Sequence, residues 1–212
     1  AVKSQIDFIT AELFNYQHIG VGREGGDQGE FSAIFYDTTK FEVLKSDTFW
    51  LSETPNQISK GWDADYHRIC TYALFKDKES SEKFYIFNTH FDHRGKVART
   101  NSARLIIQQI KKINVENYPV LLTGDFNLEP ETEQIQYIKS YLKDAKEVTA
   151  AIKLGPSGTF NAYDFQTPVT RRIDYIFHSE EINVETYAVL SDNEDGRYAS
   201  DHLPVFVKII LK

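Results

Sequence analysis

The chain has 212 residues, of which 41% are hydrophobic and 26% are charged. This length and composition are typical of a globular protein with one domain, or at most two, and a substantial core. The net charge of −7 argues against a protein that coats nucleic acid through a broad basic face, although it allows local binding of a phosphate.

The first part of the chain predicts one helix followed by short strands. Apolar residues three and four apart predict an amphipathic helix over Val2–Tyr16. A short strand over His18–Gly22 leads into a Gly-rich loop, Arg23–Glu30. The runs Phe31–Tyr36 and Phe41–Leu44 are separated by a four-residue polar turn, so they predict a strand pair.

Further along the chain, strands and helices alternate. The polar stretch Ser52–Asp65 predicts a surface loop. A helix is predicted over Ala98–Ile113. A second helix is predicted from Pro130 onward, since proline is tolerated in the first turn of a helix. The continuous apolar run Pro119–Thr123 predicts a strand that is covered on both faces. The remaining strands are predicted over Ile69–Phe75, Phe84–Asn88, Ile173–Phe177, Val184–Leu190 and Val205–Leu211.

These elements predict a single α/β domain, which some schemes class as α+β, with mixed rather than purely parallel sheets. No internal repeat, linker or low-complexity segment divides the chain, and no apolar run approaches the length of a membrane-spanning helix. Cys70 is the single cysteine, so an internal disulfide is impossible, and its apolar neighbours favour a buried thiol.

Four short polar motifs lie beside the predicted strands. They are Asn88-Thr89-His90, Gly124-Asp125-Phe126-Asn127, Arg172-Ile173-Asp174-Tyr175 and Ser200-Asp201-His202. Each one lies where an apolar run meets a polar loop, and α/β proteins commonly build their sites at such strand ends. Four such motifs together indicate a functional site.

Two of these motifs carry groups that suit phosphate chemistry. Asp125 and Asn127 are two residues apart at an extended strand end, so both side chains can face one cleft; the alternative is a turn that simply ends the strand. His90 is either a structural histidine or part of the same cluster. Arg94, in the loop that follows His90, is either a bidentate phosphate ligand or a solvated side chain.

The other two motifs supply an acid–histidine pair. Asp174 lies in an apolar strand, where a carboxylate needs a specific partner. Arg171 or Arg172 is the structural candidate for that partner, and His202 is the functional one. Because adjacent residues of an extended chain point to opposite sides, we expect Asp201 to bind a metal and His202 to face the substrate.

Other known patterns fit the sequence less well. The spaced glycines Gly20, Gly22 and Gly25 resemble a dinucleotide-binding loop, but a strand is predicted where that loop needs a helix. The stretch His90–His93 resembles part of a dinuclear zinc site, but position 88 is Asn where that site needs a histidine. A calcineurin-like phosphoesterase would need further Asp, Asn and His motifs that the chain lacks.

In their order, the four motifs resemble those of the endonuclease/exonuclease/phosphatase superfamily over essentially the whole chain. The resemblance implies a four-layer sandwich of two packed mixed β-sheets flanked by helices. It also implies hydrolysis of a phosphodiester or a phosphomonoester by in-line attack of water, with Mg2+ as the metal and Mn2+ as the alternative. The stretch Phe31–Trp62 is most similar to bacterial members without an assigned substrate.

The resemblance implies a role for each member of the acid–histidine pair. Asp201 is the expected ligand of the catalytic metal. His202 is expected to contact the scissile phosphate or to transfer a proton, and the Asp174 carboxylate is expected to orient it.

The same resemblance assigns the remaining polar residues to the water and the phosphate. Asp125 is expected to position or deprotonate the attacking water, and Asn127 to hold that water or a phosphate oxygen. His90 is expected to stabilise charge on the phosphoryl oxygens. Arg68 and Arg94 are the expected substrate-binding residues.

One departure from the family pattern concerns the beginning of the chain. The family starts with a strand that carries an Asn and a second strand that ends in Gln-Glu, whose Glu is a main metal ligand. The helix over Val2–Tyr16 resembles the one that follows this Glu. We therefore expect roughly 40–60 further residues ahead of Ala1, and weak Mg2+ binding and little activity for the 212-residue chain alone.

The expected partner is a phosphate-ester substrate, and we expect a monomer. Nucleic acid is not excluded, although the loop Arg23–Glu30 carries one Arg against three acids. The compartment is left open, with a secreted or periplasmic location as one expectation. The alternative to an enzyme is a catalytically impaired phosphate- or metal-binding module of the same fold.

Overall fold

A six-stranded sheet in the order β3-β4-β5-β6-β9-β7 forms the centre of the molecule. The computed structural model describes residues 1–148 and 152–211. In this sheet β5 and β6 are parallel and the other neighbouring strands are antiparallel, so the sheet is mixed, as the sequence predicts. Its strands are β3 (Phe41–Trp50), β4 (Ile69–Asp77), β5 (Lys83–His90), β6 (Val120–Asp125), β7 (Lys143–Asp144) and β9 (Asp174–His178).

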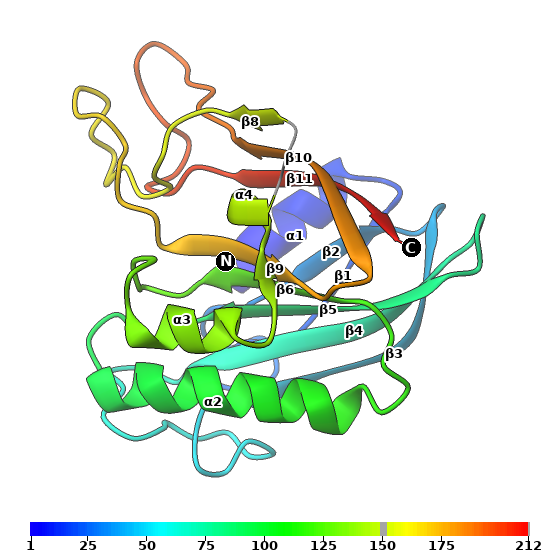
Figure 1. Cartoon of the computed structure of the whole chain (residues 1–212). Helices are drawn as coiled ribbons and strands as arrows, with labels where there is room; N and C mark the ends of the chain where they lie inside the picture. Colours follow the sequence, from blue (N-terminus) through cyan, green and yellow to red (C-terminus); the bar gives the residue numbers. More distant parts are fainter. Residues whose placement is uncertain (149–151, 212) are drawn as a thin grey trace.

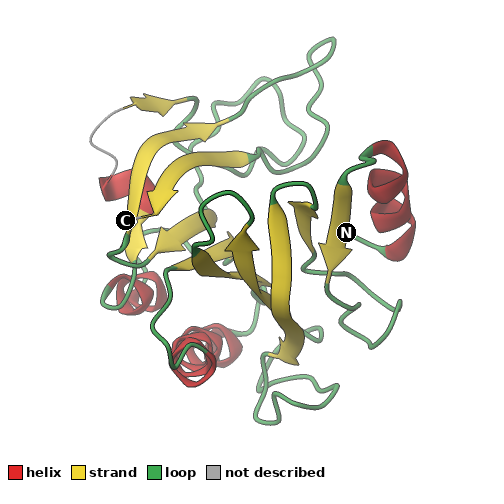
Figure 2. Ribbon diagram, turned by 90° about the vertical axis from the view of Figure 1, so that its right-hand side faces the viewer, coloured by secondary structure: helices red, strands yellow, loops and turns green. Residues whose placement is uncertain are grey.

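Two smaller sheets form the second β layer (Figures 1 and 2). One is the antiparallel pair of β1 (Tyr16–Ile19) and β2 (Ile34–Asp37). The other has the order β11-β10-β8, with β11 (Val205–Leu211) antiparallel and β8 (Ile152–Leu154) parallel to β10 (Ile182–Val189).

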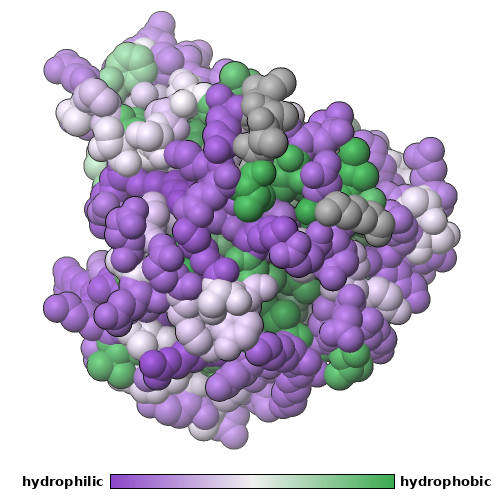
Figure 3. Space-filling model, viewed as in Figure 1, coloured by the Kyte–Doolittle hydropathy of each residue, from purple (hydrophilic) through white to green (hydrophobic). Residues whose placement is uncertain are grey.

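Four helices are present in the described part of the chain: α1 (Lys3–Glu12), α2 (Lys96–Ile113), α3 (Glu133–Lys139) and α4 (Ala145–Val148). Helices α2 and α3 lie on one side of the central sheet, and α1 lies beside β1 at the far side of the second β layer (Figures 1 and 2). The surface over α2 is mainly hydrophilic (Figure 3). None of the described helices is long and apolar enough to cross a membrane.

The central strands are apolar on both faces because each face is covered. Tyr72, Tyr175 and Phe177 belong to the core between the sheet and helices α2 and α3. Ala73 and Ile176, the alternate residues of the same strands, pack on the opposite side with the small sheets. Cys70 is buried, as predicted, and burial raises the pKa of its thiol. The layers confirm the predicted sandwich.

Three local predictions are wrong. The segments Phe31–Tyr36 and Phe41–Leu44 do not form a hairpin, because β2 pairs with β1 and β3 pairs with β4. Their apolar residues instead pack against each other across the two layers, around Phe75. Helix α1 ends at Glu12 rather than at Tyr16, which is the first residue of β1.

The third error concerns Pro130. Helix α3 begins at Glu133, and Pro130 occupies a turn in which Thr132 N donates to Glu129 O at 3.1 Å. Proline is favoured at the second position of such a turn for the same reason as in a first helical turn, namely its fixed φ. Pro130 therefore correctly indicates a helix, but this helix begins three residues later, at Glu133.

Candidate active site

Three of the predicted site residues lie side by side on neighbouring strands. His90, the last residue of β5, is paired with Asp125, the last residue of β6. Asp125 is in turn paired with Asp174, the first residue of β9. Because β9 runs opposite to β6, its start meets the ends of β5 and β6 at one edge of the sheet. The topology thus brings together motifs that are far apart in the sequence.

Gly124 allows this close approach of β5 and β6. Its φ is +143°, and a Cβ atom at this position would lie 1.9 Å from the carbonyl oxygen of Thr89. No side chain fits there, and few L residues adopt this backbone conformation. A glycine before Asp125 is therefore required for the alignment of Asp125 with His90.

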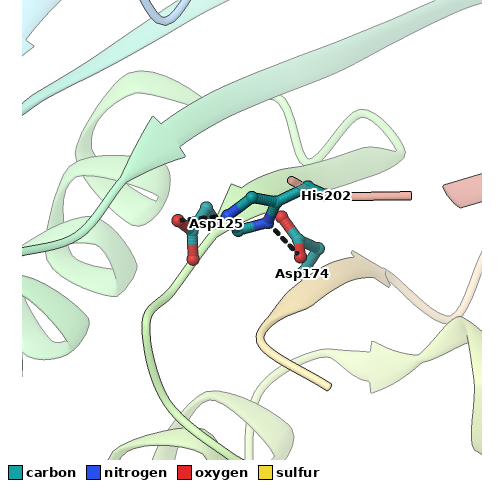
Figure 4. Close-up of side chains that lie close together, drawn as sticks. All are labelled: Asp125, Asp174 and His202. Atoms are coloured by element: carbon teal, nitrogen blue, oxygen red, sulfur yellow. Dashed lines mark hydrogen bonds and ion pairs between the residues drawn. The ribbon is translucent and has the colours of Figure 1, made fainter. Parts of the chain in front are cut away.

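His202 completes the cluster from the segment that precedes β11. Its Nδ1 lies 2.8 Å from Asp174 Oδ2, and its Nε2 lies 3.9 Å from Asp125 Oδ2. Figure 4 shows the imidazole between the two carboxylates. Thr159, which is fully buried, donates its hydroxyl to the same Asp174 oxygen at 2.6 Å. Asp174 is thus fixed from two sides.

The two structural candidates for the partner of Asp174 are engaged elsewhere. Arg172 is buried and forms a bidentate pair with Asp144, at 3.1 and 2.8 Å. Arg171 lies 3.5 Å from a carboxylate oxygen of Glu129. The structure therefore pairs Asp174 with the histidine, which is the functional alternative.

Asp125 combines a structural role with a place in the cluster. Its Oδ1 accepts the backbone N–H of Asn127 at 2.8 Å, which is the strand-ending turn considered from the sequence. Its Oδ2 lies 3.2 Å from His90 Nε2 and accepts the Asn127 side-chain amide at 3.2 Å. Asn127 adopts φ of 50° and also donates to Phe91 O.

The electrostatics favour a carboxylate beside a histidinium. Burial raises the pKa of Asp125, but contacts with His90, Asn127 and His202 lower it below its ordinary value. Burial lowers the pKa of His202, but the hydrogen bond to Asp174 and the charges of Asp174, Asp125 and Asp201 raise it overall. Opposite charges within reach of each other stabilise the charged form of each group.

Asp201 lines the same cavity as His90, Asp125, Asn127 and His202, which has a volume of about 400 Å³. Its backbone carbonyl accepts the N–H groups of residues 161 and 162, at 2.8 and 3.2 Å, which holds the loop before β11 in place. In the described residues, the acid–histidine group compact enough to hold a metal is Asp125, Asp174 and His202. The role of Asp201 as a metal ligand stays a prediction.

The two predicted arginines lie in different environments. Arg68 is buried and lines the cavity, and its Nε donates to the buried carboxylate of Asp92 at 3.5 Å. The side chain of Arg94 is 74% exposed and pairs with Asp65 at 3.2 Å. Among the described residues, those that line the cavity do not include Arg94. The structure thus brings Arg68, but not Arg94, to the site.

Several residues of the site carry no clear signal in the sequence. Thr159 contacts Asp174, and the ring of the next residue, Phe160, lies edge-on to the His202 imidazole, with centroids 5.1 Å apart. Both belong to a loop without apolar periodicity. The cavity also includes Arg23, Glu30, Tyr66 and His93, which come from three loops.

Comparisons with known proteins agree with this geometry. Residues 6–202 match the model of the Endonuclease/Exonuclease/phosphatase family. The chain belongs to this family. A protein of Acanthamoeba polyphaga mimivirus is 31% identical over 184 residues, which cover 82% of this chain and 68% of that protein. Family membership confirms the resemblance read from the four motifs and places the chain among phosphoester hydrolases.

Solved structures of other proteins are similar in fold. A mannosyl-6-phosphatase from Bacteroides thetaiotaomicron is 40% identical with a TM-score of 0.94, covering 98% of this chain and 82% of that chain. The human Nocturnin catalytic domain, solved with a bound sulfate anion, is 20% identical with a TM-score of 0.76. The match covers 100% of this chain and 78% of the Nocturnin domain, and it shows the shared fold alone.

Proposed function

We propose that this protein is a divalent-metal-dependent phosphatase that hydrolyses a phosphate monoester of a small alcohol. The position of His202 between the carboxylates of Asp125 and Asp174 is the observation that carries the proposal. The 40% identity to a mannosyl-6-phosphatase supports a monoester rather than a diester.

The residues divide the work of an in-line attack. Asp125, a carboxylate beside two histidines, orients the attacking water and accepts its proton. Asp174 fixes the His202 ring and helps to raise its pKa, which favours the protonated form, so His202 donates to a phosphoryl oxygen as charge develops there. His90 and Arg68 also line the cavity and add donors for the phosphate.

The donors of the cavity fit a hard cation. The carboxylate of Asp201 and the amide oxygen of Asn127 are oxygen ligands of the kind that Mg2+ or Mn2+ prefers. A bound cation supplies charge that polarises the phosphate. His202 and Asp174 are each other's hydrogen-bond partners, so we assign them to substrate rather than to the metal.

The test is hydrolysis of a panel of phosphate monoesters and diesters by the purified full-length protein, with Mg2+, with Mn2+ and with a chelator. We expect metal-dependent release of phosphate from monoesters. His202→Ala should abolish turnover and leave substrate affinity within a modest factor, whereas a catalytically impaired binding module would show binding and no turnover in the parent protein. Metal-independent activity, or no hydrolysis of any ester, would contradict the proposal.

A further inference from the structure

One wall of the catalytic cavity takes no part in the steps assigned above. It consists of Arg23, Glu30 and Tyr66, which line the cavity together with the catalytic residues. We propose that this wall, the alcohol-side wall, binds the alcohol half of the substrate, and that this half is a neutral, hydroxyl-rich group such as a hexose. The inference rests on the proposed phosphatase function and names its substrate class.

The alcohol-side wall is built in advance of any ligand. Arg23 N donates to Glu30 O at 2.9 Å, so these two residues face each other across a short hairpin-like loop. The indole N–H of Trp50 donates to Arg23 O at 2.7 Å and anchors the loop to the end of β3. A wall that is ordered before binding loses little conformational entropy when the ligand arrives.

The groups on the wall match a polyol. The Arg23 guanidinium stacks over the Tyr66 ring at 4.7 Å from its centroid, and Nη1 of Arg23 pairs with the Glu30 carboxylate. The Glu30 side chain is 45% exposed, so its oxygens can accept hydroxyl protons, while the guanidinium can donate to hydroxyl oxygens. The half-exposed Tyr66 carries a phenolic hydroxyl, which can both donate to and accept from a hydroxyl group.

The charge on the wall argues against a polyanionic substrate. Glu30 balances Arg23, so the wall lacks a surplus positive charge, unlike the phosphate side with Arg68 and two histidines. A second phosphate of a polynucleotide would meet the Glu30 carboxylate here. The cavity, of about 400 Å³, also lies near the lower end of the range typical for small molecules.

The experiment compares two monoesters and three variants in the presence of Mg2+. Mannose 6-phosphate carries hydroxyl groups, and phenyl phosphate carries none. Glu30→Gln should lower kcat/KM for mannose 6-phosphate by about tenfold or more, mainly through KM, and change that for phenyl phosphate by less than about twofold. Tyr66→Leu should act in the same direction. Asp27→Asn, the same kind of change at an exposed position of the loop, is the matched control.

The possible results separate this inference from the phosphatase proposal. If Glu30→Gln affects both esters equally, or neither, the wall does not read hydroxyl groups and the inference is wrong while the phosphatase proposal stands. If no ester is hydrolysed, the phosphatase proposal fails. Calorimetric titration then tests the wall: mannose 6-phosphate should bind the parent about tenfold or more tightly than it binds Glu30→Gln, and equal affinities, or failure to bind the parent, would overturn the inference. Circular dichroism confirms that each variant is folded.

Discussion

Asp92 holds Arg68 in place, so its replacement by Asn should weaken both the fold and the site. The Asp92 side chain is 1% exposed. Its Oδ1 accepts the N–H groups of Arg94 and Gly95, at 2.9 and 2.7 Å. Its Oδ2 accepts the N–H of Asp65 at 3.0 Å and the Nε–H of Arg68 at 3.5 Å. In Asp92→Asn, one of the two oxygens becomes an NH2 group that faces only donors.

The pKa of Asp92 sets the size of the expected effect. Burial raises this pKa, but backbone N–H groups and the charge of Arg68 outweigh burial and lower it from 3.8 to about 2. That difference corresponds to about 2.5 kcal/mol of stability at neutral pH. Because the folded-state pKa is the lower one, this stability is present above pH ~4 and is lost as the pH falls toward 2. The unpaired Arg68 charge brings the expected loss in Asp92→Asn to about 3 kcal/mol or more.

Urea unfolding of the parent, Asp92→Asn and the exposed control Asp27→Asn at pH 7 measures this loss directly. Repeating the series between pH 5 and the lowest pH at which the proteins stay folded tests whether the lost stability comes from the charge of Asp92. The parent should lose stability steeply on acidification, and Asp92→Asn should lose about 2 kcal/mol less. A loss below about 0.5 kcal/mol at pH 7, or identical acid profiles, would refute the argument.

Three further predictions concern the site. Gly124→Ala should destabilise the protein by about 3 kcal/mol or more in urea unfolding, because its methyl group would overlap Thr89 O. Thr159→Val should cost about 2 kcal/mol and lower kcat, since it removes the hydroxyl bonded to Asp174; unchanged kinetics would contradict a positioning role. Asp174→Asn should lower the pKa of His202 in an NMR titration. Because the pKa of His202 is raised in the folded state, His202 stabilises the fold below pH ~6.5, and this stabilisation disappears as the pH rises through the folded-state pKa. Asp174→Asn should therefore lose this stabilisation at low pH.

The sequence predicts the site residues better than it predicts their arrangement. Asp125, Asp174 and His202 stand out because each carboxylate or imidazole interrupts the edge of an apolar run, and such residues need a partner when buried. Their alignment in one row depends on the pairing of β5 with β6 and of β6 with β9, which alternation within a strand does not encode. The family resemblance, rather than periodicity, predicts that these residues share one site; it does not predict which strands pair.

The errors have physical causes of the same kind. Phe31–Tyr36 and Phe41–Leu44 are apolar runs joined by a short turn, and that pattern suits both a hairpin and a chain that changes layers. The burial of Phe75 between the layers selects the second outcome, and Phe75 lies more than 30 residues after Leu44, the end of the second run. The sequence carries no signal for Thr159, because a hydroxyl group in a loop follows no pattern. Only its contact with Asp174 gives Thr159 a role.

The proposed division of the cavity follows from where each charge is neutralised. The Arg68 charge is matched by Asp92 at a buried position, and Arg68 Nη2 lies 3.3 Å from His93 Nδ1, so on the cavity side the guanidinium meets histidine nitrogen rather than a carboxylate and can donate to a phosphate. The Arg23 charge is matched by Glu30, which itself lines the cavity, so that part of the wall presents a donor and an acceptor together. A phosphate needs donors alone, whereas a hydroxyl group needs both. One cavity can therefore hold the two halves of a sugar phosphate in a single orientation, with the ester bond beside His202 and Asp125.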